Sequence, residues 1–227
     1  MELTILMPCL NEAAAVADCV REAADYLKSR GITGEVLVAD NGSSDNSREL
    51  AAEAGARVIT VGERGYGNAL RGGISAAKGQ YIILGDCDGS YDFSDLDPIL
   101  KKLRQGWHLV MGDRFSGGIA DGAMPRSHRY FGVPLLSWLG RRRFGVAVSD
   151  FHCGLRGMTR REAQNADFRC GGMEFATEMI GCFADAGLKI CQVPVPLRRD
   201  RRHGPGHLRT IPDGIRHLTL ILFWKHK

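Results

Sequence analysis

The first half of the chain alternates short apolar runs with longer stretches in which apolar residues recur at helical spacing. This alternation is typical of consecutive βαβ units. It predicts an α/β fold in which a mostly parallel central sheet is flanked by helices. Five of the runs are predicted to be strands: Leu3–Pro8, Glu35–Asp40, Arg57–Val61, Tyr81–Gly85 and Leu109–Gly112.

Helices are expected between these strands. The first contains Val16, Val20, Ala23, Ala24 and Leu27 at helical spacing, with Asn11 as its N-cap and Gly31 as its stop. Three more are expected over Asp45–Ala54, Ala69–Lys78 and Leu96–Gln105, each bounded by Ser, Asn or Asp in front and Gly behind. The segment Arg114–Gly132 is rich in Gly, Arg and His, which predicts a long functional loop.

Composition restricts the class of protein. A chain of 227 residues with 44% apolar and 25% charged residues is typical of one soluble folded domain. The net charge of +4 is too small to indicate a nucleic-acid partner, and none is expected. Arginines gather at 141–143 and at 198–209, whereas the acidic run 86–97 suits a divalent cation. Charge alone is equally compatible with solvated surfaces at all of these places.

The seven cysteines are scattered and never form Cys-x-x-Cys, which disfavours a disulfide framework or a zinc site and indicates buried thiols in a reducing cytosol. The apolar run Leu3–Met7 lacks the basic flank of a signal peptide. No segment approaches the roughly 20 apolar residues of a spanning helix. Leu218–Trp224, between basic residues, is compatible with either a membrane-facing element or a last core helix.

Polar residues and turn formers follow four of the predicted strands. Ligands of parallel α/β sheets bind beyond the carboxyl ends of the strands, so these residues are expected to converge on one site. The segments are Pro8 to Glu12, Asp40 to Asp45, Arg64 to Asn68, and Asp86 to Asp88.

Asp86 and Asp88 are two residues apart directly after an apolar strand. If the backbone stays extended, both carboxylates point into one crevice and can share Mg²⁺ or Mn²⁺. Asp95 and Asp97 have the same spacing, but they follow Ser94 at an expected helix start, where acids are favoured for structural reasons. We therefore expect the first pair to bind metal and the second to be structural.

Six ordered motifs resemble those of inverting family 2 glycosyltransferases of the GT-A fold, a Rossmann-like fold of nucleotide-diphospho-sugar transferases. The resemblance covers nearly the whole chain and is strongest to the dolichyl- or polyprenyl-phosphate mannosyl- and glucosyltransferases. The motifs are Pro8-x-x-Asn11-Glu12, Asp40-Asn41-Gly42-Ser43-x-Asp45, Gly65-Tyr66-Gly67-Asn68-Ala69, Asp86-x-Asp88, Gly112-x-Arg114 and Asp150-x-x-Cys153-Gly154-x-Arg156.

The resemblance implies that Pro8, Glu12 and Asp40 contact the nucleoside, and that Asp86 and Asp88 hold the metal against the donor diphosphate. Gly67 and Arg156 lie in matched motifs and are also assigned to the substrate site. Ser90 stands where the dolichyl-phosphate mannose synthases commonly have Gln, which leaves the third metal ligand open. A single catalytic domain is expected, with a nucleotide-binding half at 1–113, an acceptor-side half at 114–210 and a C-terminal helix at 211–227.

Cleavage of the anomeric bond leaves a nucleoside diphosphate, whose developing charge calls for a metal and fixed cations. Arg114, Arg202 and Arg209 are candidates, with Arg114 favoured, because guanidinium matches phosphate oxygens. The alternative for each is an ordinary surface charge or ion pair. Glu174 and Glu178, spaced i and i+4, either face donor hydroxyls, with Glu174 as the contact, or form a solvated helix edge. His203 and His207 flank Gly204-Pro205-Gly206, which excludes a helical metal site and suggests a lid.

Asp150 has a role that depends on the acceptor. A sugar hydroxyl must lose its proton as it attacks, which would make Asp150 the general base. A phosphate monoester, with a second pKa near 6, attacks as a dianion without help, and Asp150 would then orient groups or bind the cation. A third reading is a side chain that caps the turn before Cys153.

The expected reaction is transfer of a hexose from a donor such as UDP-glucose or GDP-mannose to a polyprenyl or dolichyl phosphate, at the cytoplasmic face of a membrane. Resembling chains often continue into spanning helices, so a membrane-embedded partner region is also expected. The alternatives are a hydroxyl acceptor, on a sugar or another lipid, and a non-catalytic subunit that binds the nucleotide sugar. A nicotinamide-dependent dehydrogenase is disfavoured because no Gly-x-Gly-x-x-Gly follows the first strand, and a pyrophosphorylase because no Gly-rich triphosphate loop does.

Overall fold

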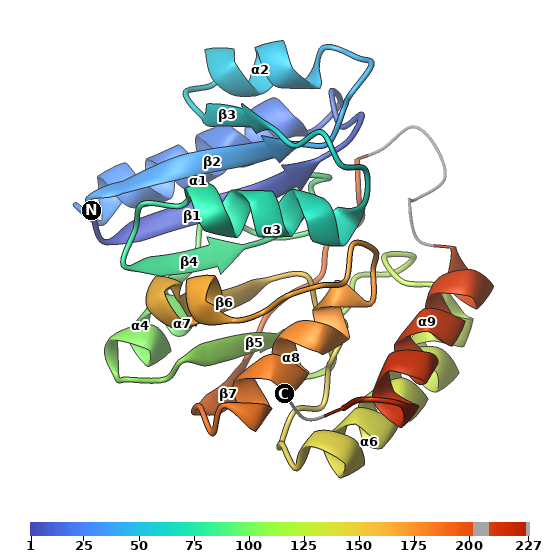
Figure 1. The fold of residues 1–227 in the computed structure, drawn as a ribbon. Coiled ribbons are helices and arrows are strands. Elements are labelled where there is room, and N and C mark those ends of the chain that lie inside the picture. Colours follow the sequence, from blue (N-terminus) through green and yellow to red (C-terminus); the bar gives the residue numbers. More distant parts are fainter. Residues whose placement is uncertain (202–208, 226–227) are drawn as a thin grey trace.

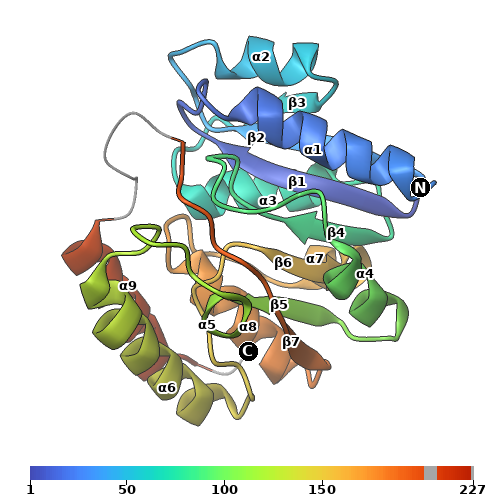
Figure 2. The same cartoon turned by 180° about the vertical axis from the view of Figure 1, so that it is seen from behind.

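A computed structural model describes residues 1–201 and 209–225. Within these residues one seven-stranded sheet, in the order β3-β2-β1-β4-β6-β5-β7, carries helices on both faces (Figures 1 and 2). The strands are β1 (Leu3–Cys9), β2 (Gly34–Asp40), β3 (Arg57–Thr60), β4 (Tyr81–Leu84), β5 (Leu109–Asp113), β6 (Arg156–Thr159) and β7 (Ile190–Pro194). The helices are α1 (Val16–Ser29), α2 (Ser47–Glu53), α3 (Tyr66–Ala76), α4 (Asp97–Arg104), α5 (Arg114–Gly117), η1 (His128–Gly132), α6 (Val133–Phe144), α7 (Arg160–Asn165), α8 (Phe175–Asp185) and α9 (Thr210–Leu222).

The expected α/β class is confirmed. Strands β1 to β5 lie where the apolar runs predicted them, and the pairs β1·β2, β1·β4, β2·β3 and β5·β7 are parallel. Strand β7 was not predicted. Nor was β6, which runs antiparallel to both β4 and β5. Its four residues include Gly157 and the buried Arg156, so they do not form an apolar run. The position of β6 is therefore set by its neighbours rather than by its own sequence.

The sheet is buried on both faces. Along β1, Ile5 and Met7 belong to the core beneath α1 and α4, while Leu6 belongs to the core beneath α3 and α8. Successive side chains of a strand point to opposite faces, and here both faces are apolar. The central strands consequently have continuous apolar sequences, as buried parallel strands do.

The prediction of Asn11 as the N-cap of the first helix is wrong. Helix α1 begins at Val16, and its N-cap position is Ala15. Asn11 adopts a positive φ of 56°, and its Oδ1 accepts a hydrogen bond from the backbone N–H of Ser44 at 2.8 Å. This contact ties the loop after β1 to the loop after β2, which a local capping pattern does not reveal.

The prediction of one long loop over Arg114–Gly132 is also wrong in part. Helix α5 begins directly after β5, because Oδ1 of Asp113 accepts from the N–H groups of Phe115 and Ser116 and so caps the helix. The loop after α5 ends in η1, which continues into α6. An irregular connection remains only between these helices.

Helices α6 and α9 lie side by side at one end of the molecule (Figures 1 and 2). Trp224, just after α9, packs edge-on against Phe144 of α6 with ring centroids 5.4 Å apart, and its Nε1 donates to Asp185 at 2.8 Å. Of the helices in the described part of the chain, none combines the length and the apolar character needed to cross a membrane.

Candidate active site

The loops that follow β1 and β2 are joined by backbone-to-side-chain hydrogen bonds. The N–H of Glu12 donates to Oγ of Ser47 at 2.8 Å, and the N–H of Asn11 donates to Oγ of Ser43 at 3.0 Å. The carbonyl of Pro8 accepts from the Cys87 thiol at 3.1 Å, which adds the loop after β4. The three strand ends expected to form a site therefore lie together.

Asp40, fully buried at the end of β2, shapes the turn that follows it. Its carboxylate accepts from the N–H groups of Gly42, at 3.1 Å, and Ser43, at 3.3 Å. Nε of Arg48 lies 3.9 Å from it. Gly42 has a φ of 88°, a conformation that favours glycine. The carboxylate thus sits in a rigid polar turn at the sheet edge.

Asp86 and Asp88 follow β4. Oδ1 of Asp86 accepts from the hydroxyl of Tyr66 at 3.0 Å, and Oδ1 of Asp88 accepts from the N–H and the hydroxyl of Ser90 at 2.9 and 2.5 Å. Burial, together with the charge of Asp86, raises the pKa of Tyr66 well above its ordinary value. The phenol therefore stays protonated and acts as a fixed donor to Asp86.

Gly154 provides the room that Asp86 occupies. A Cβ at position 154 would lie 2.4 Å from Oδ2 of Asp86, so only glycine is accommodated without moving the carboxylate. The N–H of Gly154 donates to the hydroxyl of the buried Tyr91 at 2.7 Å. The loop before β6 is thereby seated directly against the Asp86-x-Asp88 segment.

These two aspartates are suitable ligands for a hard divalent cation. Carboxylate oxygens are what Mg²⁺ and Mn²⁺ prefer, and a cradle that only glycine permits keeps one of them in place. In residues 1–201 and 209–225, no group of three His, Cys, Asp or Glu side chains could hold a metal ion. The structure thus leaves the prediction of Asp86 and Asp88 as metal ligands without a third protein carboxylate, thiol or imidazole among the described residues.

Asp150 and Arg114 form a buried bidentate ion pair. Nε of Arg114 donates a hydrogen bond to Oδ2 of Asp150 at 2.7 Å, and Nη2 of Arg114 donates one to Oδ1 at 2.8 Å. The N–H groups of Arg114 and His152 also donate to this carboxylate, each at 3.2 Å. Both oxygens of the expected catalytic aspartate are therefore already hydrogen-bonded.

Arg156 and Gly67, both assigned to the substrate site, have packing contacts. The guanidinium of Arg156 is buried and donates to the carbonyls of Cys153, Phe151 and Ala176 at 2.6, 3.0 and 2.6 Å. A Cβ on Gly67 would lie 2.3 Å from the carbonyl oxygen of Cys170. Arg156 thereby ties the loop before β6 to α8, and Gly67 allows α3 to approach the segment before α8 closely.

Glu174 and Glu178 differ in environment. Glu174 is the N-cap residue of α8 and lies 4.0 Å from Nη1 of Arg216 in α9. Glu178 is buried, and its two oxygens accept from the N–H groups of Arg169 and Cys170, each at 2.9 Å. The reading of this pair as a solvated helix edge is therefore wrong for Glu178, because it braces the backbone in front of α8.

Of the candidate phosphate-binding arginines, Arg209 is exposed at the N-terminus of α9, where its N–H donates to Asp213 at 2.7 Å. Arg202, His203 and His207, with the suggested lid, lie outside the described residues.

The segment 198–201 lies against the loop that carries Asp88; the sequence indicated an arginine-rich run here, with Arg201 at the start of the suggested lid. The N–H of Arg198 donates to the carbonyl of Ser90, and that of Arg201 to the carbonyl of Asp88, both at 2.8 Å. Arg198 also pairs with Glu22 and Asp92. This strap covers the loop that carries Asp88.

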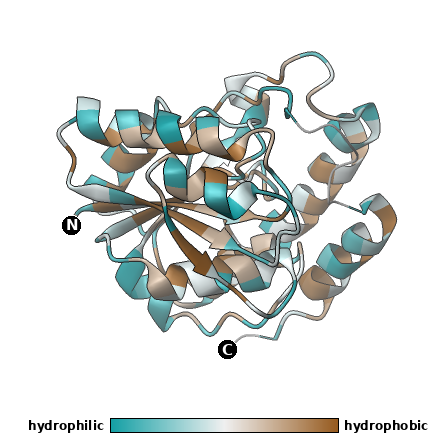
Figure 3. Cartoon of the chain, turned by 90° about the horizontal axis from the view of Figure 1, so that it is seen from above, coloured by the Kyte–Doolittle hydropathy of each residue, from teal (hydrophilic) through white to brown (hydrophobic). Residues whose placement is uncertain are grey.

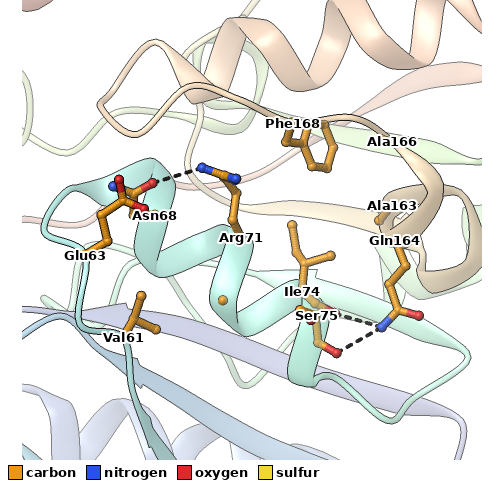
Figure 4. A pocket seen from close by; sticks show the side chains of 11 residues that line it. Val61, Glu63, Asn68, Arg71, Ile74, Ser75, Ala163, Gln164, Ala166 and Phe168 are labelled. Atoms are coloured by element: carbon orange, nitrogen blue, oxygen red, sulfur yellow. Dashed lines mark hydrogen bonds between the residues drawn. The ribbon is translucent and has the colours of Figure 1, made fainter.

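Two hollows flank α3. A cleft of about 680 Å³ lies between its N-terminal end and α9, and is lined by Arg64, Gly65, Gly171, Gly172, Glu174, Ile215, Arg216, Thr219, Leu220 and Phe223. The other, of about 640 Å³, lies between α3 and α7 (Figure 4). There Arg71 donates to Asn68, and Gln164 donates to the carbonyls of Ile74 and Ser75. Asn68, from the expected segment Arg64 to Asn68, lines this second hollow, whereas the candidate catalytic and metal-binding residues do not.

Comparison with known proteins identifies the family. Residues 4–168 match the family model described as glycosyl transferase family 2. The chain belongs to this family. The resemblance to family 2 glycosyltransferases and the predicted GT-A architecture are thereby confirmed.

Curated glycosyltransferases resemble this protein along most of its length. It is 39% identical to the low-salt glycan biosynthesis hexosyltransferase Agl6 of Haloferax volcanii, over 97% of this chain and 53% of the relative. It is 28% identical to the dolichyl-phosphate hexose transferase of the same organism, over 87% of this chain and 83% of the relative. The chain thus spans about half the length of Agl6.

A solved glycosyltransferase shares the fold. The glucosyl-3-phosphoglycerate synthase of Mycobacterium tuberculosis, in complex with Mn²⁺, UDP-glucose and phosphoglyceric acid, superposes with a TM-score of 0.76 at 22% identity. The match covers 97% of this chain and 79% of that one.

Proposed function

We propose that this glycosyltransferase is a metal-dependent, inverting hexosyltransferase that uses a nucleotide-diphosphate sugar and a polyprenyl or dolichyl phosphate at a membrane surface. The observation that carries the proposal is the seating of Asp86 and Asp88 beside the loops after β1 and β2, with Asp86 held by Tyr66 and Gly154. The names of the relatives, which include hexosyltransferases and a dolichyl-phosphate hexose transferase, support the sugar and the lipid.

The donor is proposed to lie along the edge formed by β1, β2 and β4. Pro8, Glu12 and Asp40 would contact its nucleoside, and Asp86 and Asp88 would hold Mg²⁺ or Mn²⁺ against its diphosphate. The metal would neutralise the charge that develops on the departing nucleoside diphosphate. The related synthase that binds Mn²⁺ and UDP-glucose supports this arrangement and a donor of the UDP-glucose type.

The acceptor is proposed to be a phosphate rather than a hydroxyl. A hydroxyl needs a base to take its proton, but both oxygens of the buried Asp150 receive donors from Arg114 and from backbone N–H groups. A phosphate dianion needs no base. Its oxygen would attack the anomeric carbon from the face opposite the diphosphate, and the carbon–oxygen bond to the diphosphate would break with its electron pair on the leaving group.

Under this proposal Asp150 is a positioning residue. Its carboxylate holds the guanidinium of Arg114, the residue that directly follows β5. It also accepts a hydrogen bond from the N–H of His152 and so fixes the loop that continues to Gly154. A hydroxyl acceptor, the alternative, would require the pair to open so that one Asp150 oxygen faces the substrate. A non-catalytic subunit would bind the donor without turning it over.

The test is transfer of a labelled hexose from UDP-glucose and GDP-mannose, with Mn²⁺ or with EDTA, to two acceptors that differ only in the phosphate: a short polyprenyl phosphate and the matching polyprenol. We expect Mn²⁺-dependent product with the phosphate and background with the alcohol. Equal transfer to both acceptors would establish a hydroxyl mechanism. If the protein binds a donor but releases no nucleoside diphosphate with any combination of donor and acceptor, the alternative of a non-catalytic subunit is favoured.

A further inference from the structure

Large apolar side chains are exposed together on α6 and α9. Ten large hydrophobic residues are exposed among those described, and eight of them lie on or beside these two helices. We call this surface the α6/α9 face; its residues are Tyr130, Phe131, Leu135, Trp138, Ile211, Ile215, Leu222 and Phe223. Large apolar side chains exposed on neighbouring elements often mark an interaction site.

Each helix has two distinct sides. In α6, Ser137, Gly140 and Phe144 are buried against the body of the protein, whereas Leu135 and Trp138 are 58% and 46% exposed. In α9, Asp213, His217 and Ile221 are buried, and the exposed residues recur at helical spacing on the opposite side. The buried sides hold both helices to the body, so the exposed apolar sides are not needed for folding. Figure 3 shows apolar colouring on both helices.

The charged side chains on η1 and α6 are all arginines or histidine, and Glu174 and Asp185, at the two ends of α8, are acids that contact α9 or Trp224. No acidic residue occurs between Asp121 and Asp150, a stretch that contains five arginines. Two of them lie over exposed rings: the guanidinium of Arg129 is 5.6 Å from the Tyr130 ring centroid, and that of Arg142 is 5.5 Å from the Trp138 centroid.

The C-terminal helix adds three more cations. These are Arg209, Arg216 and Lys225, whereas the single acid of this segment, Asp213, is buried. Asp213 pairs with both of the arginines. The segments that form this face therefore combine exposed aromatic and aliphatic groups with several basic residues.

We infer that the α6/α9 face docks on an anionic lipid bilayer, with its apolar side chains in the interface and its arginines against headgroup phosphates. Amphipathic helices with aromatic and aliphatic groups on one side and Lys or Arg around them bind in this way, and each cation near the surface strengthens the attraction. A second copy is a poorer occupant, because two such faces would bring like charges together. The inference depends on the proposed function in one respect, which is that the acceptor is taken to be a lipid.

Docking would also orient the site. Ile215 and Phe223 belong to the α6/α9 face and line the cleft of about 680 Å³ beside Gly65 and Gly171. A bilayer in contact with this face would therefore lie at the mouth of that cleft, next to the N-terminal end of α3. An acceptor anchored in the bilayer could enter without leaving it.

The test is sedimentation of the protein with vesicles of phosphatidylcholine alone and of phosphatidylcholine with 30% phosphatidylglycerol, at low and high salt. We expect binding to the anionic vesicles, weaker binding to neutral ones and weakening by salt. Phe131→Ser with Leu135→Ser should reduce binding about tenfold or more, because it removes two exposed apolar anchors. Arg129→Gln with Arg142→Gln should reduce binding to anionic vesicles only.

The controls are Phe115→Ser, an exposed aromatic on α5, and Lys28→Gln with Lys101→Gln, two lysines on α1 and α4. Equal vesicle binding by the wild type and all variants would overturn the inference. So would a dimer, seen by analytical ultracentrifugation, that the Phe131 and Leu135 variant abolishes. Transfer to a water-soluble short-chain acceptor is measured in parallel. If the wild type does not transfer sugar to this acceptor, the proposed function is contradicted. If the wild type transfers sugar but does not bind vesicles, only the docking inference is contradicted.

Discussion

The Asp150 carboxylate and the Arg114 guanidinium meet in a two-point contact, Oδ2 to Nε at 2.7 Å and Oδ1 to Nη2 at 2.8 Å, with Asp150 fully buried. Bidentate pairs of this geometry fix both partners, and their contribution depends on both being present. Breaking one leaves a buried charge without compensation. This relationship places Asp150 in the scaffold of the site as much as in its chemistry.

Asp150→Asn should therefore lower the free energy of unfolding by about 3–5 kcal/mol as well as reduce turnover. The measurement is urea unfolding of Asp150→Asn, Arg114→Gln and the double variant. We expect the double variant to be no less stable than either single one, because neither charge is then left alone. A fully stable Asp150→Asn protein that has lost turnover and the acid limb of its pH–rate profile would instead identify Asp150 as the base.

The metal assignment is tested by Asp88→Asn. Loss of one carboxylate ligand should reduce transfer by about 10²-fold or more, because the charge on the leaving diphosphate is no longer neutralised in place. The chain offers a matched control in Asp95→Asn, an exposed member of the second Asp-x-Asp tripeptide, which should leave transfer unchanged. Transfer that survives Asp88→Asn at the wild-type rate, over a Mn²⁺ titration, would exclude this residue as a ligand.

The fold was largely predictable from the sequence because its central strands are buried on both faces and therefore appear as apolar runs. Strand β6 could not be predicted, because Arg156 and Gly157 interrupt its apolar pattern. It forms a strand because its backbone pairs with β4 and β5. The structural reading of Asp97 was sound: it begins α4 and its Oδ1 accepts from the Tyr26 hydroxyl at 2.9 Å. Local sequence patterns were sufficient to predict the central strands and the structural role of Asp97, but not β6.

The site was predictable only as a set of strand ends. That Tyr66 would bond to Asp86, or that Gly154 would make room for it, depends on contacts between residues 20 and 68 positions apart from Asp86. The same holds for Arg156, whose three carbonyl partners come from two separate segments. Such contacts leave no periodic trace, so a motif indicates that these residues matter without indicating what each one touches.

Tyr66→Phe should weaken metal binding while preserving the fold. The variant removes only the hydroxyl that donates to Oδ1 of Asp86 at 3.0 Å. Groups that orient a metal ligand typically contribute about tenfold or more to affinity, so the Mn²⁺ concentration for half-maximal transfer should rise by about that factor. The checks are Mn²⁺ titration of transfer and a melting temperature, which should change little. An unaltered titration would show that Tyr66 does not position the ligand.

Gly154→Ala should displace Asp86, because the new Cβ would come within 2.4 Å of Oδ2. We expect transfer to fall at least tenfold, with Mn²⁺ affinity reduced in parallel, since the misplaced ligand is the one that Tyr66 holds. Gly62→Ala is the control, because a Cβ there meets nothing within 4 Å. If circular dichroism shows an intact fold and Gly154→Ala transfers normally, the cradle is not required.

The attachment of α9 should depend on pH through His217. Its Nδ1 lies 2.8 Å from Oγ1 of Thr177 in α8, and burial, reinforced by the charge of Arg156, lowers its pKa to about 4. The unfolded chain takes up a proton near pH 6.5, whereas the folded one does so only near 4, so stability should fall as pH drops through this range. The loss should approach roughly 3 kcal/mol. Unfolding measured from pH 7 to 4 should show a smaller slope for His217→Gln than for the wild type. Identical slopes for the two proteins would mean that His217 does not make stability depend on pH in this range.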